Sequence, residues 1–197
     1  SFELLDADGK TIETVENAAD GSFSFTALEY DLSDAGKTYT YTVQEVAGAL
    51  PGVTYDDTVY TMMVEVTDNG DGTLEVTAST NATALDFTNK YAATGETQFR
   101  GTKALIGKAL EANQFSFELL DEGGNVIETV QNAADGSFEF AVLNYDLSDA
   151  GKTYTYTVKE TAGSMAGVTY DETIYTVTVT IADNGDGTLT ATASANA

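Results

Sequence analysis

The stretch YTYTVQE, residues 39–45, returns 115 positions later as YTYTVKE, residues 154–160, and it decides the fold. Successive side chains of a β-strand point to opposite faces of the sheet. Tyr39, Tyr41 and Val43 therefore share one face, and the threonines between them share the other. This alternation of apolar and polar residues predicts a strand with one buried face in each copy.

The repeat extends far beyond this stretch. SFELLDADG at residue 1 returns as SFELLDEGG at residue 116, again an offset of 115, and the register holds without a gap from residues 1–82 to residues 116–197. Solenoid repeats have periods of about 20–50 residues, so each copy here has enough chain for a core of its own. We expect two units, residues 1–90 and 101–197. The small, polar segment 91–100 is expected to be a linker.

Turn sequences separate the other alternating runs. DNGDG occurs at residues 68–72 and again at 183–187, each time between two apolar-alternating segments, and this is a strong hairpin signal. Helical spacing is scarcely visible. About seven short strands per unit, each with one apolar face, predict an all-β fold of tandem Ig-like antiparallel β-sandwich domains.

Composition excludes several functions. The net charge is −24, with eight Lys and Arg, and so acidic a surface repels nucleic acid and anionic lipid. Cys and His are absent, which excludes disulfides, thiol nucleophiles, the usual zinc sites and a Ser-His-Asp triad. The aspartates of the two DNGDG turns could suggest a calcium site, but their spacing does not fit the EF-hand template. We therefore expect no metal and no cofactor. The turn carboxylates are Asp68, Asp71, Asp183 and Asp186.

Two glutamates break the alternation. Counting in twos from Tyr41 and Tyr156 places Glu45 and Glu160 on the apolar face of their strands. A buried carboxylate must be neutral, paired or hydrogen-bonded, because an isolated buried charge is strongly destabilising. The alternative is a glutamate at the strand end that just reaches water, since Ala-Gly follows closely in both copies.

A lysine and an asparagine break the pattern in the same way. Lys103 shares a face with Leu105, and Asn89 shares a face with Phe87. Inward-facing lysine, asparagine and glutamate suggest one reaction, in which the lysine amine attacks the asparagine side-chain carbonyl and ammonia leaves. The glutamate would move the protons, and fixed proximity would supply much of the rate.

Several segments together resemble one known family. They are residues 102–121 (TKALIGKALEANQFSFELLD), 154–160 (YTYTVKE), 167–189 (GVTYDETIYTVTVTIADNGDGTL) and 86–91 (DFTNKY). In combination they resemble the isopeptide-linkage domain of Gram-positive shaft pilins of the streptococcal type, a relative of the collagen-adhesin B-type modules. The resemblance covers nearly the whole chain. It implies Lys103 as nucleophile, Asn89 as acceptor, and Glu45 and Glu160 as autocatalytic proton shuttles.

The positions depart from the family pattern in one respect. In the family a lysine of the first strand joins an asparagine of the last, whereas here Lys103 opens the second repeat and Asn89 closes the first. We therefore expect that the first unit lacks its lysine strand, that the second lacks its asparagine strand, and that Lys103 and Asn89 do not bond each other. A window of a longer array fits this pattern, and so does a truncated chain whose strand another chain supplies.

The resemblance also implies a function. We expect a structural repeat of a bacterial cell-surface fibre or pilus, extracellular and self-crosslinked for mechanical and proteolytic stability, and not an enzyme acting on an outside substrate. Its partners would be neighbouring repeats or subunits of the same fibre, with no nucleic acid and no membrane. An adhesin module that binds a host protein or glycan through its loops is the alternative.

Overall fold

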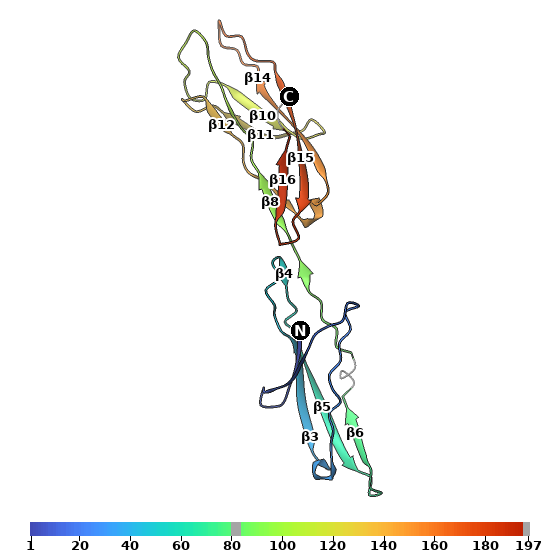
Figure 1. Cartoon of the computed structure of the whole chain (residues 1–197). Helices are drawn as coiled ribbons and strands as arrows, with labels where there is room; N and C mark the ends of the chain where they lie inside the picture. The colour runs from blue at the N-terminus through green and yellow to red at the C-terminus, as the bar shows by residue number, and fades with distance from the viewer. Residues whose placement is uncertain (80–83, 195–197) are drawn as a thin grey trace. The chain divides into compact units, whose positions relative to one another are not determined.

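The computed structural model describes residues 1–79 and 84–194. The chain divides into two compact units, Ser1–Tyr91 and Ala92–Ala197 (Figure 1). Within the described residues the only helices are two single 3-10 turns, η1 (Leu32–Asp34) and η3 (Leu147–Asp149). Every strand ladder in these residues is antiparallel, and one isolated bridge, Thr94 with Thr188, is parallel. The prediction of tandem antiparallel β-sandwich domains is confirmed.

The first unit is built on a five-stranded sheet with the order β2-β1-β3-β5-β6. Figure 1 shows β3, β5 and β6 side by side. A short pair, β4 with β7, adds a second small sheet. The bounds are β1 (Phe2–Leu5), β2 (Thr11–Val15), β3 (Thr38–Glu45), β4 (Val53–Thr54), β5 (Val59–Asp68), β6 (Leu74–Ala78) and β7 (Lys90–Tyr91).

The core of the first unit follows the period-two pattern. Tyr41 and Val43 of β3 are buried at 8% and 0% exposure, and they lie opposite Met62 and Tyr60 of β5. Burial of these apolar side chains on one face is the main stabilising contribution of the sheet. The DNGDG sequence makes the expected hairpin turn, in which Gly70 has a positive φ of 76°.

The second unit repeats the sheet and adds two ladders. The sheet order is β11-β10-β14-β15-β16, and separate pairs are formed by β9 with β12 and by β8 with β13. The bounds are β8 (Thr94–Thr97), β9 (Arg100–Thr102), β10 (Ser116–Leu120), β11 (Val126–Gln131), β12 (Ser137–Glu139), β13 (Leu143–Asp146), β14 (Thr153–Thr161), β15 (Ile174–Asp183) and β16 (Leu189–Ala193). Stacking of Phe117 from β10 on Phe138 from β12, with ring centroids 3.7 Å apart, packs the small β9–β12 sheet against the large one.

The segment expected to be a linker contains strand β8, which is a difference from the sequence-based division. Ala93 is 2% exposed, and β8 pairs with β13 through main-chain hydrogen bonds that require no apolar alternation. Gly95 approaches Leu189 so closely that a Cβ there would collide with the Leu189 carbonyl oxygen. Small, polar residues therefore allow close backbone packing here. The contact-based division of the chain falls between Tyr91 and Ala92.

The same sequence forms a strand in one unit and not in the other. NAADGS occurs at residues 17–22 and 132–137, but β12 begins at Ser137, whereas residues 22–24 lie outside every strand. In the second unit the pairing partner of β12 is β9, and no strand described in the first unit occupies the corresponding position. Pairing with a partner, and not local propensity, decides whether this segment becomes a strand.

Candidate functional site

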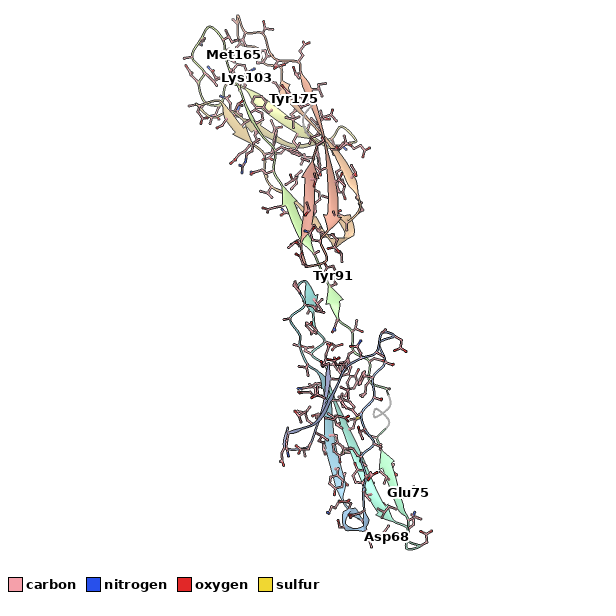
Figure 2. The ribbon with its side chains drawn as sticks, viewed as in Figure 1. Asp68, Glu75, Tyr91, Lys103, Met165 and Tyr175 are labelled. Carbon is pink, nitrogen blue, oxygen red and sulfur yellow. The ribbon has the colours of Figure 1, made fainter. Side chains whose placement is uncertain are left out.

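In the second unit Lys103 and Glu160 form a nearly buried ion pair. Lys103 Nζ donates to Glu160 Oε2 at 2.6 Å, and the two side chains are 12% and 3% exposed. The backbone N–H of Asp171 donates to the same oxygen at 3.1 Å. The Lys103 ammonium also lies 4.5 Å from the centre of the Phe115 ring, within cation–π range. Figure 2 shows Lys103 and Tyr175 at the same end of this unit, and both line one small cavity.

Local backbone contacts fix the position of Lys103. Its backbone N–H donates to the Gly136 carbonyl at 2.7 Å, directly after β9 ends. Gly136 has a φ of 88°, and a Cβ there would collide with the Lys103 carbonyl oxygen, so this turn requires glycine. On the other side, Glu160 lies opposite Phe117 in the β10–β14 ladder. Both side chains are therefore held by regular main-chain structure.

One oxygen of the Glu160 carboxylate has no hydrogen-bond partner. Oε1 is buried, and no donor within the described part of the chain reaches it. Buried polar atoms are nearly always hydrogen-bonded, because an unsatisfied one keeps its full desolvation cost. With 3% exposure, the Glu160 side chain does not fit the alternative of a strand-end glutamate that reaches water.

In the first unit Glu45 holds an asparagine in place of a lysine. Asn89 Nδ2 donates to Glu45 Oε1 at 2.8 Å. The backbone N–H of Asp56 donates to Asn89 Oδ1 at 2.9 Å and also to Glu45 Oε2 at 3.1 Å. The Asp56 carboxylate accepts from the Thr88 backbone N–H at 2.6 Å and so ties the asparagine segment to the sheet.

The two units thus display complementary halves of one arrangement. At the offset of 115, Glu45 corresponds to Glu160 and Asp56 corresponds to Asp171. Oε1 accepts the asparagine amide in the first unit and has no partner in the second, while the second unit contributes the lysine. The structure places Lys103 on Glu160 and Asn89 on Glu45, so each unit brings together two of the sequence-predicted residues.

The backbone donors at Asp56 and Asp171 were missed by the sequence analysis. A main-chain N–H belongs to every residue except proline, so residue type gives no direct signal for it. The available signal was the sequence VTYD, residues 53–56 and 168–171, whose aspartate follows the glutamate by eleven positions in both repeats. In the first unit this N–H donates to the asparagine carbonyl oxygen, which is the geometry in which a backbone donor can stabilise an oxyanion.

The turn carboxylates have local hydrogen-bond partners. Asp71 accepts from Thr73, and Asp186 accepts from Thr188, through both backbone and hydroxyl donors. The hydroxyl bond is the largest cause that holds the pKa of each of these carboxyl groups below its ordinary value. Across residues 1–79 and 84–194, no group of three or more acidic side chains is placed to hold a metal ion. No helix in the same residues is long and apolar enough to cross a membrane.

Comparison with known families gives one match, to two copies of the same domain. The model of the FctA family, described as "Spy0128-like isopeptide containing domain", matches residues 1–92 and residues 99–197. The two matches correspond closely to the two compact units. No curated protein sequence matches the chain.

Proposed function

The chain belongs to the FctA family of Spy0128-like isopeptide-containing domains, and from this premise we propose that it is a self-crosslinked structural repeat of a Gram-positive surface fibre or pilus. Domains of this family are typical of Gram-positive pilus and surface proteins. The crosslink in this proposal is an amide between the side chains of a lysine and an asparagine.

One observation carries the proposal. The Glu160 carboxylate binds the Lys103 amine through Oε2 and has Oε1 buried without a partner, and the corresponding Oε1 of Glu45 binds the Asn89 amide. A carboxylate with the amine on one oxygen and the carboxamide on the other lies between the two groups that must exchange protons. This is the position of a general acid and base.

The proposed reaction balances in atoms and protons. Glu160 Oε2 accepts a proton from the Lys103 ammonium, and the free amine attacks Cγ of an asparagine held at Oε1. The backbone N–H of Asp171 stabilises the oxyanion, as its counterpart Asp56 already donates to the Asn89 carbonyl oxygen. The carboxylic acid then protonates the departing Nδ2, and the carboxylate so formed takes the second proton from Nζ, so that Glu160 ends as a neutral carboxylic acid. The Nζ–Cγ bond forms, the Cγ–Nδ2 bond breaks, and one ammonia leaves.

The bond suits a load-bearing fibre. It would join the first and last strands of a unit, so that tension passes through the amide and bypasses the strands between. Closing a loop of about 100 residues contributes roughly 4–5 kcal/mol in the chain-entropy model. The chain contains no cysteine, so this amide takes the part that disulfides have in many extracellular domains.

The experiment that tests this proposal supplies the asparagine segment as a peptide. A peptide with the sequence of residues 84–91 is mixed with the chain, and the product is examined by denaturing gel and intact mass. We expect an adduct one ammonia lighter than the sum of its parts. Lys103→Arg preserves the positive charge but not the nucleophile, and should give none. Tight binding of the peptide with no covalent adduct would contradict the proposal.

A further inference from the structure

We propose that Asn132 is a positioning residue for the crosslinking reaction and fixes the Lys103 side chain at both of its ends. The inference rests on the proposed function, because it takes Lys103 as the nucleophile. The side chain of Asn132 forms its hydrogen bonds with two segments that hold Lys103, and not with Lys103 itself. It therefore acts on the reaction through other residues.

Asn132 is a buried polar residue whose side chain is fully used in hydrogen bonds. It is 1% exposed, and its Oδ1 accepts from the Phe115 backbone N–H at 2.8 Å. Its Nδ2 donates to the Glu111 carbonyl at 2.9 Å and to the Ala133 carbonyl at 2.8 Å. Rotation of this amide would leave buried polar atoms unpaired, which is costly. The side chain is therefore a fixed point to which two segments are attached.

The first of these segments is the loop before β10, which is also held to Asn132 by its main chain. The backbone N–H of Asn113 donates to the Asn132 carbonyl at 2.8 Å, and the Asn132 N–H donates to the Phe115 carbonyl at 3.2 Å. Asn113 has a φ of 64°, a left-handed conformation that asparagine adopts more readily than most residues. Main-chain and side-chain hydrogen bonds to Asn132 therefore determine where Phe115 lies.

Phe115 in turn contacts the ammonium end of the Lys103 side chain. The Phe115 residue is 1% exposed, and its ring packs against that of Tyr170 with centroids 5.6 Å apart, so the ring has little space in which to move. Lys103 Nζ lies over this ring, 4.5 Å from its centre, and donates to Glu160 Oε2 at 2.6 Å. A cation–π contact and a charged hydrogen bond therefore hold the ammonium together. Displacement of the ring would release one of these two restraints.

The second segment is the turn between β11 and β12, which holds the backbone of Lys103. The Ala133 carbonyl that accepts from Asn132 Nδ2 also accepts from the Gly136 N–H at 3.0 Å, and this bond closes the turn. The Gly136 carbonyl then accepts from the Lys103 N–H at 2.7 Å. Asn132 is therefore connected by hydrogen bonds to the backbone of Lys103 as well as to the residue whose ring lies beneath the ammonium.

The first unit shows that the turn alone does not require all of these bonds. Asn17 corresponds to Asn132 at the offset of 115, and it is exposed. Its Nδ2 donates to the Ala18 carbonyl at 3.0 Å, and the Gly21 N–H donates to the same carbonyl at 2.9 Å, so the same turn forms. The further bonds of Asn132 are additional to the turn, and they are the ones that fix the loop before β10.

The test compares Asn132→Ala with a control that destabilises the same unit elsewhere. Both changes are made in a full-length chain that carries Asn89→Ala, so that an added peptide of residues 84–91 is the acceptor. The control is Ile181→Val, since Ile181 is also 1% exposed. Its N–H donates to the Lys152 carbonyl just before β14 begins, at the opposite end of that strand from the ion pair.

The first readout is the NMR chemical shift of the Lys103 Cε protons. An aromatic ring current moves these protons upfield while the ammonium lies over Phe115, and Phe115→Leu gives the value without the ring. We expect Asn132→Ala to move the shift towards that value and Ile181→Val to leave it unchanged. A residue that contributed only to stability would not change this shift in the folded chain.

The second readout is the rate of amide formation with the peptide. At saturating peptide, Asn132→Ala should lower this rate by up to about a hundredfold, because small displacements of reacting groups are costly. The half-saturating peptide concentration should change little, since Asn132 acts on the lysine and not on the peptide. Asn132→Ser retains a hydroxyl that can accept from the Phe115 N–H, and its rate should lie between those of Asn132→Ala and the parent chain.

Each other outcome has a distinct meaning. A folded Asn132→Ala chain with the rate of Ile181→Val overturns the inference and leaves the proposed function standing, whether or not the chemical shift moves. If calorimetry shows that Asn132→Ala does not fold, the same comparison is made with Asn132→Ser and decides in the same way. Absence of the adduct in the parent chain contradicts the proposed function and with it the inference, and this result is independent of any change at Asn132.

Discussion

Lys103 Nζ lies 2.6 Å from Glu160 Oε2, and the two side chains are 12% and 3% exposed. An ion pair this far from water combines a large desolvation cost with a strong mutual attraction, so removing one partner leaves an uncompensated charge. In the proposed reaction the same closeness would place the lysine amine beside its proton acceptor. Under that proposal, stability and reactivity depend on the same pair.

The first prediction concerns the stability of the unreacted second unit. In an Asn89→Ala background, which removes the acceptor of the proposed reaction, Lys103→Met should lower the free energy of unfolding by about 3–5 kcal/mol, because Glu160 loses its counter-charge. The measurement is the second unit's transition in differential scanning calorimetry. Lys159→Met is the matched control, since the Lys159–Glu118 pair is more exposed, at 38% and 21%, and should contribute less than about 1 kcal/mol. Equal effects of the two substitutions would contradict a special role for the buried pair.

The second prediction concerns recognition of the asparagine segment. Tyr175→Ala should weaken binding of a non-reactive 84–91 peptide, carrying Asn89→Ala, by up to about tenfold. The Phe87 ring packs against the corresponding tyrosine of the first unit, and an aromatic pair contributes roughly 0.5–1.5 kcal/mol. Stability of the unbound chain should change little, since Tyr175 is 43% exposed. Fluorescence anisotropy of a labelled peptide gives the dissociation constant. Ile174→Ala changes the 63% exposed neighbouring residue in β15 and serves as the control. Unchanged affinity in Tyr175→Ala would place the peptide elsewhere.

The third prediction tests whether β8 belongs to the second unit. Gly95→Ala should destabilise that unit by about 1–3 kcal/mol, because its new Cβ would collide with the Leu189 carbonyl oxygen and overpack the contact. The calorimetric transition of the second unit is again the measurement. Glu96→Ala changes the exposed neighbouring position and should have little effect. A neutral Gly95→Ala, with rapid proteolysis near residue 95, would show instead that the segment behaves as a linker.

The fourth prediction is a pH dependence at the start of β14. The Tyr154 hydroxyl donates to Asp149 at 2.5 Å, and the Asp146 backbone N–H donates at 3.0 Å; the first is the main cause that lowers the pKa of the Asp149 carboxyl group. A carboxyl group with a lower pKa in the folded state stabilises fully above its unfolded pKa of about 3.9. That contribution is lost as the pH falls through the folded value.

The measurement compares thermal midpoints of the unmodified chain and Asp149→Asn between neutral pH and about pH 2. We expect the unmodified chain to be the more stable at neutral pH, with the difference shrinking below about pH 4. Tyr154→Phe removes the main donor and should reduce this dependence. A difference that stays constant with pH would mean that the hydrogen bonds to Asp149 do not depend on its charge.

Much of the fold could be predicted because it depends on local alternation. The pattern in residues 39–45 places Tyr41 and Val43 in the core, and the DNGDG sequence specifies a hairpin turn. The same alternation drew attention to Glu160 and Lys103, since a charged residue on an apolar face must find a partner. These inferences need only the period of a strand and the cost of burying a charge.

The rest depends on partners that are distant in sequence. Residues 17–22 and 132–137 are identical, yet their surroundings differ, because β9 is present beside the second copy alone. Strand β8 carries no apolar alternation, and its place is set by main-chain pairing and by the close approach of Gly95 to Leu189. The backbone donors of Asp56 and Asp171 are also invisible to a reading of side-chain types.

The unpartnered Oε1 of Glu160 can be described as local frustration in the energy landscape of the second unit. Among the described residues it is the one buried side-chain oxygen or nitrogen atom without a hydrogen-bond partner, and in the proposed reaction an asparagine amide would donate to it. Under the proposed reaction, a buried pair of charges is converted into a neutral amide next to a fully hydrogen-bonded carboxyl group. Folding would then come first and bond formation second. Release of ammonia would make the second step irreversible. The joined strands would then stay linked even when the unit unfolds.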